Sequence, residues 1–246
     1  MFDRLRDAGF EVEMTSHALA ILEIDFPELV GEIETALLSL RLPITEIIGG
    51  GGGEAKMTQR LRHALSEMGW PKHNFVMTKT VDGVAKESTS HEIDHVRRTE
   101  AGTVAFEIEW NNKDPFFDRD LENFKRLHAE AAISLGGIIT RGSEMQATMR
   151  ERVEQFALDR RIASYQDLDQ YGAGSPTAPQ KRQIEADIER GLDFAHAWAR
   201  KFTSDKYGTA TTHWSKLQER IARGVGAPCP LILIGLPLSI IDMSCC

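Results

Sequence analysis

Amphipathic stretches and short apolar runs alternate along the chain in a pattern typical of a protein built from helices and a sheet. Over residues 27–40, apolar side chains recur every three or four positions, which predicts a helix that covers one side of a core. The stretches at about 55–68 and 117–135 show the same spacing. The apolar runs 137–140 and 230–236 are short enough to be buried strands. We therefore expect an α/β fold, with a central mixed β-sheet flanked by helices.

A β-hairpin is predicted in the middle of the chain. Two short stretches, at 91–96 and 103–110, have strand-like composition and flank the turn-like sequence at 99–102. Because side chains alternate between the two faces of a strand, the second strand has one apolar face. The residues of that face are Val104, Phe106, Ile108 and Trp110.

The opposite face of the same strand carries two acidic residues, Glu107 and Glu109. If the hairpin closes symmetrically around Glu100 and Ala101, Asp94 lies directly opposite Glu107, with the two Cβ atoms about 5 Å apart. Like charges at this spacing repel one another unless a cation or a proton compensates them. Mg²⁺ prefers oxygen ligands of this kind and can activate a water for phosphodiester hydrolysis. The alternative left open is that the glutamates form the solvated face of an edge hairpin.

The remaining segments suggest a single domain, residues 1–246, with one large addition. The stretch at about 144–205 contains two helical patterns separated by a glycine- and proline-rich break at 171–179, and we interpret it as a helical insertion. Five consecutive glycines at 49–53 precede a predicted helix. A phosphate-binding loop is the alternative to a linker there, but no Gly-Lys-Ser/Thr follows.

Composition constrains the partners only weakly. The formal net charge of -8 disfavours nucleic acid on average, whereas a DNA cleft needs only local positive charge. Two groups of basic residues offer such charge: Arg60, Arg62, Lys72, Lys79, Arg97 and Arg98, and then Arg150, Arg152, Arg160 and Arg161. The cysteines at 229, 245 and 246 have no metal-ligand spacing. No targeting or membrane-spanning stretch is apparent, so we expect a cytoplasmic protein.

The segments Glu92-Ile93-Asp94-His95 and Phe106-Glu107-Ile108-Glu109-Trp110-Asn111-Asn112 resemble the catalytic hairpin of type II restriction endonucleases of the PD-(D/E)XK superfamily, in particular the BglII, BstYI and BamHI group. The likeness extends to the helices at 16–34 and to the strands at 138–142 and 230–236, about two thirds of the chain. The resemblance implies a magnesium-dependent endonuclease that makes double-strand cuts in palindromic DNA and leaves 5′-phosphate ends.

By position, the resemblance implies that Asp94 and Glu107 are the metal-binding carboxylates. It also implies that Glu109 is the third catalytic residue. That third position is Lys in most of the superfamily, can be Gln in BglII-like proteins and is Glu in BamHI. Whether Glu109 acts as the general base or binds a second metal therefore stays open.

The resemblance also implies residues that contact DNA. They are Asn111, Asn112, Lys113, Arg141, Lys206, Thr211 and Thr212, with Asn74 as an additional polar residue of the active site. Asn pairs with adenine through a donor and an acceptor, and a threonine hydroxyl serves either role. The alternatives are that Asn111 or Asn112 caps the next turn and that Thr211 or Thr212 caps the next helix.

Relatives of this group share a GATC centre in their sites, so the resemblance implies such a centre, and it also implies a DNA methyltransferase that protects the host. A two-fold dimer also follows from the need to cut both strands of a palindrome. A DNA-binding protein on the same scaffold that does not cut is the main alternative function, and a nucleotide-binding protein that uses the glycine run is a second.

Overall fold

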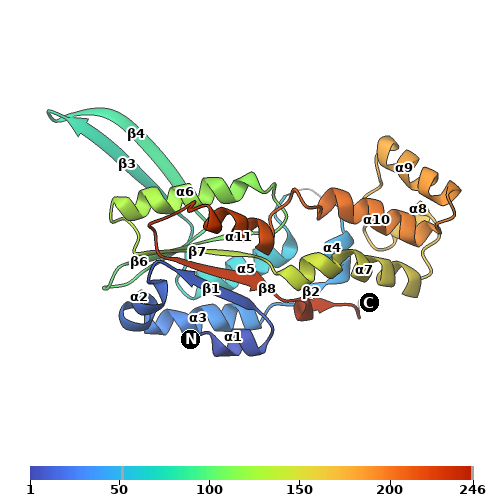
Figure 1. Ribbon diagram of the computed structural model, residues 1–246, viewed down its shortest axis with the longest axis horizontal. Helices are drawn as coiled ribbons and strands as arrows, with labels where there is room; N and C mark the ends of the chain where they lie inside the picture. The colour runs from blue at the N-terminus through green and yellow to red at the C-terminus, as the bar shows by residue number, and fades with distance from the viewer. Residues whose placement is uncertain (51–52, 245–246) are drawn as a thin grey trace.

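A computed structural model describes residues 1–50 and 53–244, which form a five-stranded mixed sheet between two layers of helices (Figure 1). The strands lie in the order β1 (Glu11–Thr15), β8 (Leu231–Leu236), β7 (Leu135–Arg141), β6 (Thr103–Glu109) and β5 (His95–Arg98). Strands β6, β7 and β8 are parallel, whereas β1 and β5 run antiparallel to their neighbours. This architecture confirms the predicted fold class.

The two faces of the sheet are covered by different helices. The apolar face of β6 packs into the core formed with α1 (Asp3–Asp7), α2 (Ala18–Asp25), α3 (Pro27–Leu38) and α5 (Lys56–Glu67). The other face is covered by α6 (Pro115–Ala129) and α11 (Trp214–Ala222), which lie above the sheet in Figure 1. Alternation in β8 follows the same rule, since Ile232 and Ile234 belong to the first core and Leu231 and Leu233 to the second.

The helix predicted over 117–135 is shorter than expected. Helix α6 ends at Ala129, Ala131 adopts a left-handed backbone with φ 54°, and Leu135 already begins β7. The apolar spacing misled the prediction because Ile133 and Leu135 are buried as well, from a turn and a strand. The helices predicted over 27–40 and 55–68 are confirmed as α3 and α5.

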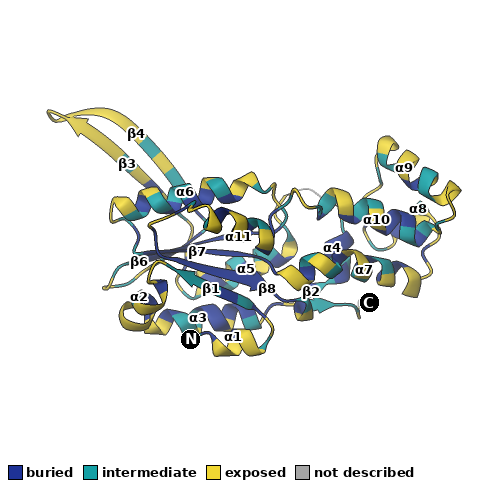
Figure 2. Cartoon of the chain, in the orientation of Figure 1, coloured by how far each residue is buried: buried dark blue, intermediate teal, exposed yellow. Residues whose placement is uncertain are grey.

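A long two-stranded ribbon, which the sequence analysis did not predict, projects from the body (Figure 1). It consists of β3 (His73–Val81) and β4 (Val84–Ile93), joined by a turn in which Asp82 and Gly83 both have positive φ. Most of its length is exposed (Figure 2). The strand predicted over 91–96 is therefore divided: residues 91–93 belong to β4, and β5 starts at His95.

Four helices lie at the other end of the molecule: α7 (Ser143–Asp159), α8 (Tyr165–Asp169), α9 (Ala178–Glu189) and α10 (Phe194–Lys206) (Figure 1). The predicted break at 171–179 falls between α8 and α9. That this region is an insertion stays a prediction. Shorter elements complete the chain: α4 (Ile44–Ile48), β2 (Leu42–Pro43), β9 (Ile241–Asp242) and a 3₁₀ turn, Leu238–Ile240.

Two predictions fall partly outside the described residues. Residues 51 and 52 of the glycine run and Cys245 and Cys246 are not described, whereas Cys229 is a buried free thiol. Gly49 and Gly50 contact the loop at 172–173. Over the described part of the chain, no helix combines the length and hydropathy needed to cross a membrane.

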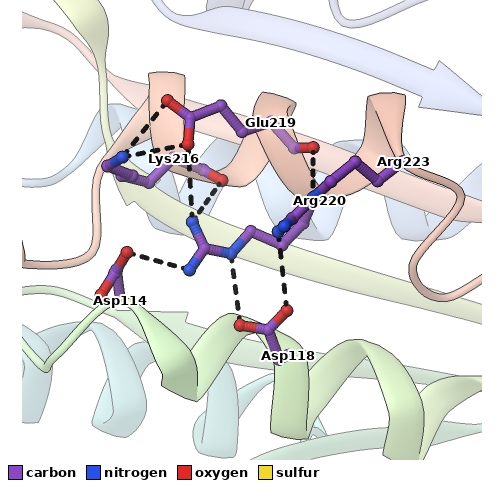
Figure 3. Close-up of polar contacts among 6 residues, drawn as sticks. All are labelled: Asp114, Asp118, Lys216, Glu219, Arg220 and Arg223. Atoms are coloured by element: carbon purple, nitrogen blue, oxygen red, sulfur yellow. Dashed lines mark hydrogen bonds and ion pairs between the residues drawn. The ribbon is translucent and has the colours of Figure 1, made fainter.

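Arg220 of α11 is buried between α11 and α6 and forms ion pairs with the start of α6 (Figure 3). Its Nη2 lies 2.9 Å from Asp114 Oδ2 and its Nε 3.2 Å from Asp118 Oδ2. Asp114 is the N-cap residue of α6 and directly follows the loop 111–113. The arginine therefore fixes the start of the helix at the point where the loop that follows β6 ends.

Candidate active site

The hairpin of β5 and β6 brings Asp94 and Glu107 together. His95 lies opposite Phe106 and Arg98 opposite Thr103, which is the predicted register. Asp94 itself lies in the bend between β4 and β5, one residue before the ladder begins, and its carboxyl group makes a hydrogen bond with that of Glu107. The predicted contact between these two carboxyl groups is confirmed, although Asp94 is not a strand residue.

A fourth carboxyl group, which the sequence analysis missed, joins this cluster from α6. Asp120 is fully buried, and Glu107 and Glu109 are only 4% and 3% exposed beneath the same helix. Asp120 lies close enough to Glu109 to raise the pKa of that carboxyl group, and its Oδ2 has no hydrogen-bond partner among the described residues. The available signal was an acidic residue on the apolar face of α6, three positions after Phe117 and next to Leu121.

Burial dominates the electrostatics of this carboxylate cluster, which we define as Asp94, Glu107, Glu109 and Asp120. Burial, with the charges of Asp120 and Asp94, raises the pKa of Glu107 well above its usual value. Burial and Asp120 raise the pKa of Glu109 to about 8, against the opposing effects of Asn112 and Arg119. Burial also raises the pKa of Asp120. Arg119 and Lys72 compensate only part of the negative charge of these four carboxyl groups, so the cluster favours proton uptake or cation binding.

Glu109 has three polar neighbours. Asn112 donates from Nδ2 to Oε2 at 2.7 Å, and Arg119 Nη2 lies 3.5 Å from Oε1. The third neighbour is Asp120, to which Arg119 is bonded at 2.7 Å. These contacts hold Glu109 against α6 and the loop that follows β6.

The cluster has the donor atoms that a hard divalent cation requires. All four side chains offer carboxylate oxygens, and the buried Oδ2 of Asp120 lacks a partner. As the side chains stand, no group of three or more His, Cys, Asp or Glu residues in the described chain can hold a metal ion. Glu109 is turned toward Asn112 and Asp120, so its oxygens are already engaged. The residues fit such an ion by their chemistry, whereas their present arrangement does not form its complete site.

Lys72 flanks the cluster at its exposed side. Its Nζ lies 3.6 Å from Asp94 Oδ1 and 2.7 Å from Glu92 Oε1. Asn74, the predicted additional polar residue, lies on β3 opposite Glu92, at the base of the ribbon, and is exposed. In the described chain, no hydrogen bond or ion pair links Asn74 to the carboxylate cluster.

The loop after β6 and the loop before α11, both predicted to contact DNA, lie side by side. Lys113 forms a β-bridge with Thr211, and the Thr212 amide donates to the Asn112 carbonyl at 2.8 Å. The N-cap residues of the following helices are Asp114 and His213, so the capping alternatives for the asparagines and threonines are wrong. Fold topology thus brings five of the predicted residues together next to Glu109, although Thr212 is fully buried as the structure stands.

Arg141 lies beneath these loops and is fully buried. Its Nη2 donates to Thr211 Oγ1 at 2.7 Å and to the Thr212 carbonyl at 2.8 Å. The guanidinium also lies 5.0 Å from the Tyr207 ring centroid and 5.6 Å from that of Trp110. Burial lowers the pKa of Arg141 to about 10. Arg141 therefore stabilises the loop that contains Thr211 and Thr212 from the interior of the protein.

Lys206 is placed away from the cluster, whereas Lys72 is the member of the two basic groups that is paired with Asp94. Lys206 Nζ donates to the carbonyl oxygens of Ile47 and Gly49 at 2.9 and 2.8 Å, where it stabilises the end of α4. Several members of the two basic groups are paired with carboxylates: Arg60 with Glu46, Arg62 with Glu54, Arg97 with Glu32 and Arg150 with Glu154.

A cleft of about 610 Å³ opens at the edge of the site. Asp94, Lys72, Asn111 and Asn112 line it together with the start of α5. A second cleft, of about 740 Å³, shares Asn111 and residues 53–55 with it and continues toward Tyr171 and Lys206. The two form a groove that passes both the exposed carboxylate and the loop after β6.

Comparison with known proteins agrees with this geometry. A family model described as restriction endonuclease BglII/BglIII matches residues 10–236, which include the whole sheet and both loops. No curated protein gives a significant match. The chain therefore belongs to the BglII/BglIII restriction endonuclease family, a family of site-specific deoxyribonucleases.

Proposed function

We propose that this chain cuts both strands of a palindromic DNA site by magnesium-dependent hydrolysis, with the carboxylate cluster as its active site. The observation that carries the proposal is the β5–β6 register, which places Asp94 against Glu107 next to the buried Glu109. Membership of a restriction endonuclease family supports the reaction class. The P–O3′ bond would break, giving a 5′-phosphate and a 3′-hydroxyl.

In this proposal, Asp94 and Glu107 hold Mg²⁺, and Glu109 either accepts a proton from the attacking water or holds a second ion. When bound, the ion supplies a water of lowered pKa and neutralises charge on the phosphate. The half-exposed Asp94, whose side chain is 41% accessible, faces the groove, and the buried Glu107 lies behind it. DNA in the groove would therefore meet the carboxylate cluster at Asp94.

We further propose that sequence is read by the paired loops at 111–113 and 208–212. Asn111 and Asn112 offer donor and acceptor atoms at the mouth of the groove. Asn112 also holds Glu109 through its Nδ2. The Asn112 amide keeps a second N–H and its Oδ1 for a base, so a base bound there would fix the same side chain that holds Glu109. A palindrome of about six base pairs with a GATC centre is the target that we expect from the resemblance.

A C₂ homodimer is the assembly that this function requires, because the two strands of a palindrome are related by a two-fold axis. A methyltransferase of the same specificity would protect the host DNA. Light scattering of the chain on a cognate duplex would test the dimer, and a monomer both free and on DNA would contradict it.

The experiment that tests the function is an assay on plasmid DNA with Mg²⁺ or with EDTA. Discrete fragments in Mg²⁺ and none in EDTA are expected, and the mapped ends should share GATC. A mobility shift without cutting in any divalent metal would instead favour the sequence-specific binder. Binding of nucleoside triphosphate without DNA cutting would favour the nucleotide-binding alternative. Ends that share another core would overturn the GATC proposal alone.

A further inference from the structure

We propose that Arg119 is a phosphate-binding residue of the cleavage site and that the buried Asp120 holds it in place. The inference rests on the proposed function, since it assigns a group that would contact the DNA phosphate beside the carboxylate cluster. Both residues lie on α6, outside the catalytic hairpin and outside the two loops.

The guanidinium of Arg119 has one occupied edge and one open edge. Its Nε and Nη2 both lie 2.7 Å from Asp120 Oδ1, and Nη2 lies 3.5 Å from Glu109 Oε1. Within the described chain, Nη1 has no hydrogen-bond partner. The side chain is 53% exposed, whereas Asp120 is fully buried. Arg119 can therefore donate to an anion from solvent without leaving its carboxylate partner.

Two neighbours on the same helix fix this orientation. Asp120 bonds the Nε–Nη2 edge from below, and the Phe116 ring centroid lies 4.4 Å from Arg119 Cζ. A guanidinium held by a buried carboxylate and an aromatic face loses little further rotamer freedom when it binds a ligand. An unanchored surface arginine would have to be ordered at that moment.

The negative charge of the carboxylate cluster explains why a cation such as Arg119 is needed beside it. Four carboxyl groups lie together, and a DNA phosphate that approaches them is repelled unless positive charge stands nearby. Lys72 provides such charge at Asp94, at the exposed side, but it is also bonded to Glu92. Arg119 provides it at Glu109. A phosphate between Asp94 and Glu109 would thus be flanked by two cations.

The matched control is Arg126, on the same helix. Its side chain is 54% exposed, close to the 53% of Arg119, and it pairs with Glu122 at 3.2 Å. Within the described residues, no hydrogen bond or ion pair joins Arg126 to the carboxylate cluster. Arg119→Gln and Arg126→Gln therefore remove the same charge from the same helix, and only the first removes it from the site.

The test measures DNA binding and cutting separately. In EDTA, the slope of log K against log salt concentration should fall in magnitude by about one for Arg119→Gln, as expected for one lost phosphate contact, and stay unchanged for Arg126→Gln. In Mg²⁺, the single-turnover cutting rate of Arg119→Gln should fall roughly 100-fold. Arg119→Lys, which keeps the charge and the fold but not the two-point bond to Asp120, should lie between wild type and Arg119→Gln in rate and keep the wild-type salt slope.

Equal slopes and equal rates for Arg119→Gln and Arg126→Gln would overturn the inference, while the cutting wild type would leave the proposed function intact. A change in the recognised sequence at an undiminished rate would also overturn it, because Arg119 would then contact a base. A wild-type chain that cuts no DNA in any divalent metal would contradict the proposed function and this inference together.

Discussion

The Nδ2 atom of Asn112 donates a hydrogen bond to Oε2 of Glu109 over 2.7 Å. The first residue belongs to the loop that we propose reads the DNA, and the second to the cluster that we propose cuts it. The Asn112 amide has two N–H donors and one acceptor oxygen, so the same side chain can hold Glu109 and bond a base. The arrangement therefore couples recognition to the position of Glu109.

Asn112→Ala tests this coupling. Loss of a good base contact costs about 1–3 kcal/mol, so single-turnover cutting of the cognate site should fall roughly 10–100-fold. The rate on sites altered at the contacted base pair should fall much less, because that contact is absent there already. The measurement is the cutting rate on the cognate duplex divided by the rate on a singly altered duplex, for wild type and for the variant. An unchanged ratio would show that Asn112 contributes nothing to discrimination.

Glu109→Gln should stabilise the metal-free protein at alkaline pH. The folded pKa of Glu109, about 8, lies above its usual value, so the carboxyl group stabilises the fold in its protonated form. That stability is complete below about pH 4.5 and is lost as pH rises toward 8. Urea unfolding should therefore give the variant an advantage on the order of 1–4 kcal/mol at pH 8 and little at pH 5. An advantage that is equal at both pH values would contradict this account.

Arg220→Met should destabilise the protein by roughly 1–3 kcal/mol, because it leaves Asp114 and Asp118 without their shared partner (Figure 3). The control is Arg223→Met. Its side chain is 62% exposed and its Nη2 lies 3.9 Å from Asp118 Oδ1, so less than about 0.5 kcal/mol should be lost. Denaturant unfolding of both variants gives the comparison. Equal losses would mean that the buried position of Arg220 is unimportant.

Arg141→Met should make the loop at 208–213 less ordered while changing the free energy of unfolding only slightly. Among the described residues the buried guanidinium has no carboxylate partner, so an apolar side chain of similar size should change the free energy of unfolding by less than about 2 kcal/mol. Its bonds to Thr211 and Thr212 would be lost. Amide hydrogen exchange over 208–213 should therefore accelerate. Unchanged protection there would show that Arg141 does not order the loop.

The sheet and the core of the site were predictable because both depend on the period of two along a strand. The apolar face of β6 and the contact between Asp94 and Glu107 follow from alternation and from the turn at 99–102. Strands β3 and β4 lacked this signal, since only Phe75 and Ile93 of the ribbon are buried. The sequence Asp82-Gly83 was the available indication of a hairpin there.

Contacts that depend on the path of the chain were not predictable. Asp120 reaches the cluster because α6 crosses the acidic face of β6, and no spacing within the hairpin contains that information. Lys206 looked like a free cation, whereas its ammonium group is bound to two carbonyl oxygens far away in sequence. In both cases, tertiary packing determines what a charged side chain contacts.

The most direct test of the proposed active site is the single-turnover cutting rate of Glu107→Gln in Mg²⁺ on the mapped wild-type site. Glu107 is the buried centre of the carboxylate cluster, and Gln keeps its shape, so the far-ultraviolet circular dichroism should match that of wild type. Glu100→Gln, in the exposed turn of the same hairpin, is the control and should cut at the wild-type rate. We predict that Glu107→Gln binds the site but cuts it at least about 1000-fold more slowly. Full magnesium-dependent cutting by Glu107→Gln would contradict the assignment of the active site.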